Sequence, residues 1–121
     1  VGKPLLSLLN MMDATCFLLH KSTLDKSEIT QLSDIVIVAT GNDRYFGKEY
    51  FNKNTIVIDV GINSYINEFG KKKISGDVDF INVKDNVRYI TPVPGGVGPL
   101  TVSYLMSNTI RAFEINSLYN N

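Results

Sequence analysis

Among the segments of this 121-residue sequence that could do chemistry, the most conspicuous is the glycine-rich loop Gly95-Gly96-Val97-Gly98-Pro99, between a predicted strand and a predicted helix. Glycines there let the backbone approach a ligand closely, and a helix N-terminus offers free N–H groups and the positive end of the helix dipole. The spacing does not match the G-x-G-x-x-G fingerprint of dinucleotide-binding proteins. On the residues alone, a tight strand-to-helix turn and a ligand-binding loop remain equally open.

A second candidate is His20, which stands where a predicted strand ends and is followed by Lys21, Ser22 and Thr23. A lone histidine is more often a satisfied structural residue than a catalytic base. The neighbouring cation and hydroxyl groups nevertheless suit a phosphate group or the edge of a ribose. No G-x-S-x-G nucleophile elbow occurs in the sequence, so we do not expect a nucleophilic triad.

The pair Asp77 and Asp79 could ligate a hard cation, but two carboxylates are few ligands, and aspartates in turns commonly bond their own backbone. We therefore favour a turn. Cys16 is interpreted as a small residue on a buried strand. With one histidine and one cysteine the sequence offers no zinc cluster, and we expect no metal site.

The elements that position these residues alternate between strands and helices. The strands are rich in β-branched residues on both faces, which is typical of a parallel sheet covered by helices on both faces, an α/β fold. The predicted strands are 15–19, 34–39, 55–60 and 89–93; the predicted helices are 1–12, 25–32, 48–51, 82–86 and 99–118; residues 64–75 are predicted to be irregular.

Ligands of such sheets bind beyond the carboxyl ends of the strands. That rule selects four loops, which begin at His20, Thr40, Gly61 and Pro94. We therefore expect these loops to converge on one groove.

Composition excludes several classes of protein. Twelve basic and 12 acidic residues give zero formal net charge, which argues against a nucleic-acid partner. No apolar run approaches the ~18 residues of a membrane span, so we expect no membrane partner. A single cysteine rules out an internal disulfide, and the length fits one domain, residues 1–121.

Five stretches taken together are similar to a known family: VGKP at 1–4, ATG at 39–41, VIDVGIN at 57–63, GDVDF at 76–80 and TPVPGGVGPLTV at 91–102. The whole chain resembles the C-terminal, NADP-binding domain of the bifunctional methylenetetrahydrofolate dehydrogenase/methenyltetrahydrofolate cyclohydrolase family. The resemblance implies a Rossmann-type domain that helps to oxidise 5,10-methylenetetrahydrofolate with NADP. The same enzymes hydrolyse the methenyl product to 10-formyltetrahydrofolate.

The resemblance also implies site residues. Lys21 stands where the family usually has a serine facing the adenosine 2′-phosphate; a lysine can hold a phosphate as a point charge, so NADP is the expected cofactor and NAD the alternative. The expected cofactor-binding residues are Val1, His20, Lys21, Thr40, Gly41, Gly61, Ile62, Asn63 and Thr101, and the expected substrate-binding residues are Pro94, Gly95, Gly98, Pro99 and Val102.

In the family, the catalytic lysine and tyrosine belong to an N-terminal domain, which shares the tetrahydrofolate substrate with this one. We expect no catalytic residue in this chain, and we expect the chain alone to be inactive. The family's first Rossmann strand and its Gly-Arg-Ser stretch are expected before Val1, with that strand between residues 34–39 and 55–60 of the sheet. Leu105, Ile110 and Phe113 are then expected to be exposed.

The resemblance further implies a homodimer and a cytoplasmic location, with mitochondria or another organelle as the alternative. The unpaired strand edge predicts that the isolated chain self-associates. Two other functions stay open: a nicotinamide-binding domain of a different dehydrogenase, and a non-catalytic interaction module of Rossmann-like shape.

Overall fold

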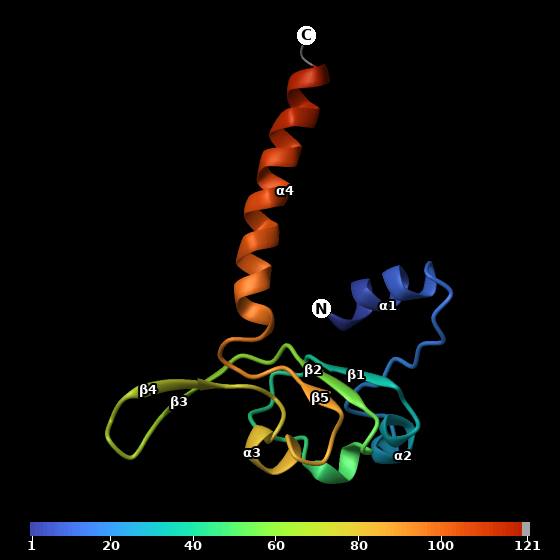
Figure 1. Ribbon diagram of the computed structural model, residues 1–121, viewed down its shortest axis with the longest axis vertical. Coiled ribbons are helices and arrows are strands. Elements are labelled where there is room, and N and C mark those ends of the chain that lie inside the picture. Colours follow the sequence, from blue (N-terminus) through green and yellow to red (C-terminus); the bar gives the residue numbers. More distant parts are fainter. Residues whose placement is uncertain (120–121) are drawn as a thin grey trace.

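The computed structural model describes residues 1–119, and a three-stranded parallel sheet lies at its centre (Figure 1). The strands are β1 (Ile35–Val38), β2 (Ile56–Asp59) and β5 (Tyr89–Ile90), in the order β1-β2-β5. Ile35 pairs with Ile56, and Ile56 pairs with Tyr89. The predicted parallel α/β sheet is confirmed, because the two β-branched runs at 34–39 and 55–60 supply its two longest strands.

The hydrophobic core lies on one face of this sheet. Val38 and Val57 point into it from adjacent strands. The short helices α2 (Lys26–Gln31), η1 (Lys48–Tyr50) and α3 (Phe80–Val83) lie on that side (Figure 1). The core consists of Val38, Phe46, Phe51, Val57, Val78 and Val83, all less than a tenth exposed.

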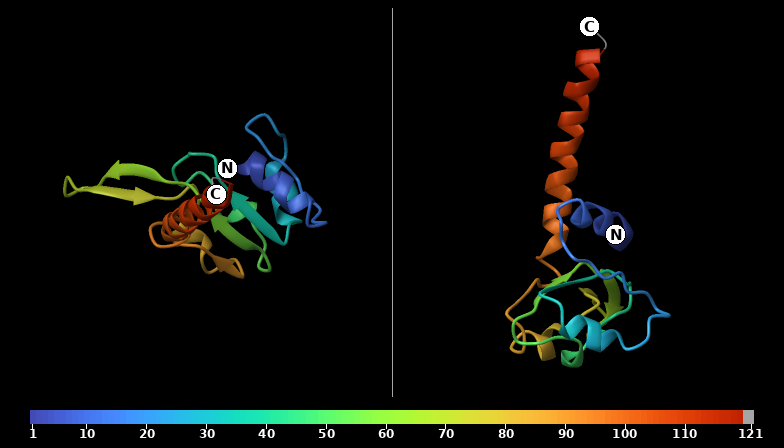
Figure 2. Two further views of the ribbon diagram at one scale, coloured as in Figure 1. Left: turned by 90° about the horizontal axis from the view of Figure 1, so that it is seen from above. Right: turned by 90° about the vertical axis from the view of Figure 1, so that its right-hand side faces the viewer.

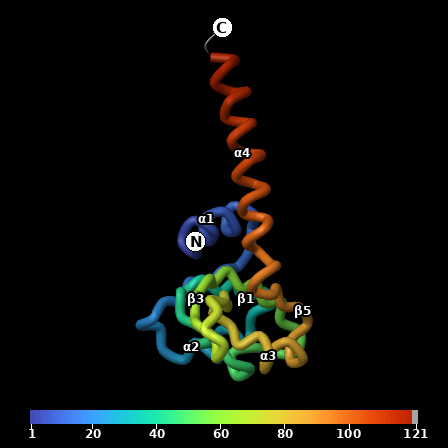
Figure 3. Tube along the Cα trace, turned by 90° about the vertical axis from the view of Figure 1, so that its left-hand side faces the viewer, coloured from blue at the N-terminus to red at the C-terminus, as the bar shows by residue number. Residues whose placement is uncertain are grey.

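Helices also lie on the other side of the sheet, but they do not bury its surface. These are α1 (Gly2–Asn10) and α4 (Val97–Tyr119), neither of which contains a buried residue. Figures 2 and 3 show α4 projecting away from the rest of the molecule. Leu105, Ile110 and Phe113 are 65%, 60% and 72% exposed, which confirms the expected apolar surface on this helix. No helix of the described chain is long and apolar enough to span a membrane.

Two predictions about the sheet are wrong. Residues 15–19 form no strand, and Cys16 is half-buried rather than part of a core. Among residues 1–119 no strand lies beside this apolar run to pair with its backbone groups, so composition alone does not make it a strand. The expected gap between 34–39 and 55–60 is also absent, since β1 and β2 are directly paired.

Residues 64–75, predicted to be irregular, are largely an antiparallel hairpin of β3 (Asn63–Ile66) and β4 (Lys72–Ser75). The side chain of Asn67 closes its turn by accepting hydrogen bonds from the amides of Phe69 and Lys71, at 3.1 and 2.8 Å. Gly70 supplies the left-handed backbone that the turn needs, with φ of +70°. The sequence does not predict this hairpin, because the lysines at 71–73 interrupt the apolar alternation expected of a strand.

Several element boundaries also differ from prediction: the helices predicted at 1–12 and 25–32 are shorter, as α1 and α2. The helix predicted at 82–86 begins earlier, as α3, and the final helix begins at Val97 instead of Pro99. β5 ends at Ile90 although a strand was predicted to residue 93. Pro92 lacks a backbone N–H, so a parallel ladder cannot continue normally through it.

Candidate cofactor-binding edge of the sheet

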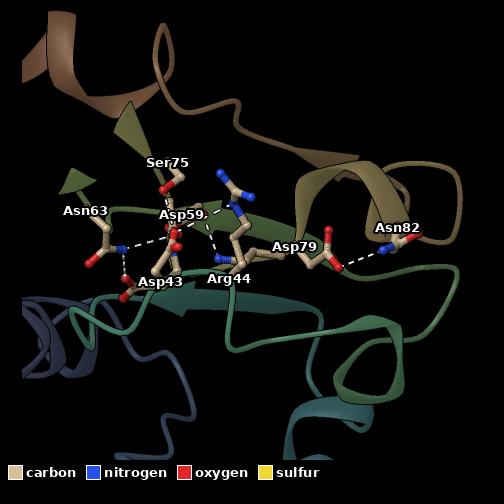
Figure 4. A network of polar contacts seen from close by, with 10 residues as sticks. Asp43, Arg44, Asp59, Asn63, Ser75, Asp79 and Asn82 are labelled. Atoms are coloured by element: carbon tan, nitrogen blue, oxygen red, sulfur yellow. Dashed lines mark hydrogen bonds and ion pairs between the residues drawn. The ribbon is translucent and has the colours of Figure 1, made fainter. Parts of the chain in front are cut away.

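Asp59 ends β2 and is only 3% exposed. One of its oxygens accepts hydrogen bonds from the amides of Gly61, at 2.9 Å, and Asp77, at 3.1 Å. The other accepts from the amide of Val78 at 2.9 Å. Burial raises the pKa of Asp59, and these three amides act in the opposite direction without cancelling it. This carboxylate fixes the turn after β2 against the segment that returns from the hairpin (Figure 4).

Asp77 is fully buried and accepts four hydrogen bonds, three from the turn after β1 and one from Asn63, where the turn after β2 enters β3. Its Oδ2 accepts from the Thr40 amide at 2.6 Å, the Thr40 hydroxyl at 3.0 Å and the Gly41 amide at 2.8 Å. Its Oδ1 accepts from the Asn63 side-chain amide at 2.8 Å. Burial acts to raise the pKa of Asp77, but the bonds from Asn63, Thr40 and Gly41 outweigh it and hold the pKa below its usual value.

The two aspartates thus join the turns after β1 and β2. Four predicted cofactor-binding residues are brought together in this way: Thr40, Gly41, Gly61 and Asn63. The segment after β5 is tied to the same edge, because the hydroxyl of Thr91 accepts a hydrogen bond from the Asp59 amide at 2.8 Å. Three of the four predicted loops therefore start from one edge of the sheet, as the topology requires.

Close packing at this edge explains one glycine of the VIDVGIN stretch. A Cβ on Gly61 would overlap the Asp77 carboxylate and would lie 2.6 Å from the Asp77 backbone nitrogen. Any side chain there would displace the carboxylate that joins the turns. Glycine is thus required at position 61 for space rather than for a left-handed backbone.

The fourth loop, which carries His20 and Lys21, is held by local contacts. The His20 Nδ1 accepts a hydrogen bond from the Ser22 amide at 3.3 Å, and the His20 amide donates to the Thr23 hydroxyl at 3.0 Å. Lys26 Nζ donates to the Lys21 carbonyl at 3.1 Å. Local bonds therefore fix the histidine ring and tie Lys26, the first residue of α2, to the backbone of this loop, while the side chains of His20 and Lys21 stay exposed.

The remaining predicted residues lie at the surface. Ile62 is 69% exposed, and Val1, at the start of α1, is 73% exposed. The hydroxyl of Thr101 donates to the Val97 carbonyl at 3.2 Å, within the first turns of α4. The predicted substrate residues Pro94, Gly95, Gly98, Pro99 and Val102 are all exposed, on the loop that enters α4 and on its first turns.

Gly95 in that loop has φ of +105°, a conformation open to glycine and strained for other residues. The preceding Val93–Pro94 peptide bond is cis.

Sequence reasoning missed Asp59 and did not recognise the role of Asp77. The signal for Asp59 was present, since a carboxylate on the inward face of a buried strand must find partners. Asp77 was considered as a cation ligand or a turn residue, and its carboxylate is saturated by donors of the chain itself. Across residues 1–119 no group of three or more His, Cys, Asp or Glu side chains is placed to hold a metal ion.

Comparison with known proteins agrees with this arrangement. Residues 1–117 match the family described as "Tetrahydrofolate dehydrogenase/cyclohydrolase, NAD(P)-binding domain". The chain belongs to this family. It is 51% identical over 114 residues to the bifunctional protein FolD of Rickettsia typhi and 49% identical over 119 residues to that of Rickettsia massiliae. These matches cover 94% and 98% of the chain but only 39% and 40% of the relatives, so the chain spans about two fifths of their length.

Solved structures of the family have the same fold. The bifunctional 5,10-methylenetetrahydrofolate dehydrogenase/cyclohydrolase of Thermoplasma acidophilum superposes with a TM-score of 0.87 at 39% identity, covering all of this chain and 42% of that one. The Trypanosoma brucei enzyme, solved with NADP cofactor and an inhibitor, gives a TM-score of 0.86 at 38% identity and covers 96% of this chain and 40% of that one. The Rossmann-type fold expected from the sequence is therefore confirmed.

Proposed function

We propose that residues 1–121 are the cofactor-binding domain of a bifunctional enzyme. That enzyme oxidises 5,10-methylenetetrahydrofolate with NADP and hydrolyses the methenyl product to 10-formyltetrahydrofolate. One observation carries the proposal: the turns after β1 and β2, which hold four expected cofactor residues, are fixed together at the carboxyl edge of a parallel sheet in a member of this family. Nucleotides bind at such edges in open α/β sheets.

NADP fits the residues of this chain better than NAD. Lys21 is exposed, and the ammonium group of Lys26 is held 3.1 Å from the carbonyl of Lys21. The exposed lysine at position 21 suits the extra phosphate of NADP, which NAD lacks. When bound, NADP accepts a hydride; the chain itself would hold and orient the nucleotide. Val1, His20, Lys21, Thr40, Gly41, Gly61, Ile62, Asn63 and Thr101 remain the residues proposed to line its site.

The folate side of the site is proposed at the loop between β5 and α4, through Pro94, Gly95, Gly98, Pro99 and Val102. These residues are exposed, and the loop is confined by two prolines and a left-handed glycine. A rigid, exposed wall of this kind suits a flat pterin ring that is shared with a second domain.

We assign no catalytic residue to this chain. Its two aspartates with shifted pKa values, Asp59 and Asp77, are buried and fully engaged by hydrogen bonds from the chain itself. Neither is accessible to a folate, and general acid–base catalysis needs a group within hydrogen-bonding reach of the substrate. The chain alone is therefore proposed to be inactive, and the acid–base chemistry is proposed to come from the remainder of the enzyme.

A homodimer and a cytoplasmic location complete the proposal. The protruding β3–β4 hairpin and the apolar surface of α4 offer exposed hydrophobic residues, among them Ile66 and Phe69 at 73% and 79% exposure. Light scattering of the enzyme tests the dimer, and cell fractionation tests the location.

The function itself is tested by comparing two proteins. One is the 121-residue chain; the other, the assembled enzyme, places the amino-terminal region of the Rickettsia typhi relative ahead of it. With methylenetetrahydrofolate and NADP, the assembled enzyme should form the methenyl product, whereas the chain alone should not. Turnover by the chain alone would contradict the absence of catalytic residues. Calorimetry that finds no affinity for NADP or NAD in either protein would favour an interaction module instead.

Specificity is tested in the same assembled enzyme. Lys21→Ala should raise the KM for NADP about tenfold, the effect of losing one charge-assisted contact, and leave the KM for NAD unchanged. Lys53→Ala, which removes an exposed lysine from the turn before β2, is the matched control. Equal effects of Lys21→Ala on both nucleotides would contradict a phosphate contact.

A further inference from the structure

Asp77 is not among the residues expected to meet the cofactor, yet the two turns expected to do so both depend on it. We propose that Asp77 is a positioning residue, which sets the affinity of the enzyme for the nicotinamide nucleotide by fixing the turns after β1 and β2 without touching the ligand. This inference rests on the proposed function.

The segment that carries Asp77 is anchored independently of any ligand. Val78 forms a parallel bridge with Phe46. The Phe46 amide donates to the Asp77 carbonyl at 3.1 Å, and the Asp79 amide donates to the Phe46 carbonyl at 3.0 Å. Both Phe46 and Val78 belong to the hydrophobic core. Asp77 therefore holds the turns from a fixed point.

The hydrogen bonds between Asp77 and the two turns require both oxygens of a carboxylate. Oδ2 takes three donors from the turn after β1, and Oδ1 takes one from Asn63 in the turn after β2. An asparagine at position 77 offers one acceptor oxygen. Its NH₂ group would face either the donors of Thr40 and Gly41 or the Asn63 amide, and no hydrogen bond forms between two donors. Asp77→Asn therefore keeps the size of the side chain but releases one of the two turns.

The same bonds decide what the turns can offer a nucleotide. The amides of Thr40 and Gly41 point at Asp77, so they are not available to a phosphate group. The Asn63 amide group donates to Asp77 and, at 3.2 Å, to the Gly76 carbonyl. These donors are therefore occupied within the chain, and the shape of the surface left for the ligand follows from where Asp77 holds the backbone.

Asp77 acts on the nucleotide through the turns and not by direct contact, because its side chain is fully buried. A cofactor at the surface of the turns cannot contact it. Its charge is offset by four donors, so direct repulsion of the cofactor phosphates is not its role. Without the Asp77 bonds the two turns are loosened and must be ordered when the nucleotide binds. The free-energy cost of that ordering lowers the affinity for the nucleotide.

The test uses Asp77→Asn in the assembled enzyme, with Asp79→Asn as a matched control. Asp79 lies two residues away and accepts a side-chain bond from Asn82 alone, at 2.7 Å. We expect Asp77→Asn to raise the KM for NADP about tenfold, as for the loss of one charge-assisted bond, and to leave the KM for methylenetetrahydrofolate unchanged. In the 121-residue chain, amide exchange at Thr40 or Gly41 should become at least about tenfold faster, while that at Val57 should not change.

A lower melting temperature with an unchanged KM for NADP would show that Asp77 serves stability alone, and would overturn the proposal. If Asp77→Asn does not fold, Thr40→Val removes the hydroxyl bond to Asp77 at a residue that is itself proposed to line the site. It should raise the same KM about threefold and also speed amide exchange at Gly41; unchanged exchange at Gly41 would overturn the proposal. If the unsubstituted assembled enzyme neither binds NADP nor turns over, the proposed function fails. If it does both and Asp77→Asn behaves like Asp79→Asn, this inference alone fails.

Discussion

Replacing Gly76 by alanine should be one of the most damaging single-methyl changes in this domain. Gly76 is buried, and a Cβ there would overlap the Asp59 carboxylate and lie 2.9 Å from Cγ2 of Val93. Asp59 cannot move aside freely, since three backbone amides hold it. The backbone at Gly76 is not left-handed, so the cost comes from space and not from backbone strain.

The size of the effect follows from two contributions. Overpacking of a tight interior costs about 1–3 kcal/mol. Displacing Asp59 loses the bond from the Val78 amide to a charged acceptor, which costs about 1.5–3 kcal/mol. Gly76→Ala should therefore lower the free energy of unfolding by about 2.5–6 kcal/mol.

The measurement is urea-induced unfolding followed by tyrosine fluorescence, since the chain has six tyrosines and no tryptophan. Gly98→Ala is the control, because a Cβ there meets no atom within 4 Å and the residue lies in α4. Alanine is favoured over glycine in a helix, so this variant should gain about 0.5–1 kcal/mol. If Gly76→Ala stays within about 1 kcal/mol of the unsubstituted chain, the packing argument at this edge is refuted.

Two further predictions concern the core and the titration of the buried pair. Val57→Ala removes two methyl groups from a fully buried position and should cost about 2–3 kcal/mol in the same unfolding experiment, whereas Leu24→Ala, at an 81% exposed site, should cost less than about 0.5 kcal/mol. The lowered pKa of Asp77 gives stability that is present above the ordinary carboxyl value and is lost as the pH falls through the lowered pKa. The raised pKa of Asp59 acts in the opposite sense: its contribution is present below the ordinary value and is lost as the pH rises through the raised pKa. The check is the free energy of unfolding of the unsubstituted chain and of both variants, measured from about pH 2 to pH 7. Asp77→Asn should lose the decline in stability at acidic pH, and Asp59→Asn should lose the decline above the ordinary carboxyl pKa. Parallel curves for the three proteins would contradict these pKa shifts.

Much of the fold could be predicted because its signals are local. The runs at 34–39 and 55–60 are β-branched on both faces, and such residues fit a strand buried on both sides wherever it lies in the sheet. The strand predicted at 15–19 rested on a short apolar run with one β-branched residue, and this prediction is wrong because a strand also needs a partner. The opposite error was made at residues 64–75, which were predicted to be irregular and form the β3–β4 hairpin. The pairing of this hairpin depends on a turn built by Asn67 and not on apolar alternation.

The sequence by itself determined the class of fold, the family and the turns in which cofactor residues were to be sought. These follow from short stretches whose meaning does not depend on what lies across the molecule. Only the tertiary structure decided how those turns are held. Asp77 is 37 residues from Thr40 and 14 from Asn63, and Asp59 is 19 from Val78. A buried carboxylate takes its partners from whichever backbone folding brings beside it, and spacing along the chain does not contain that information.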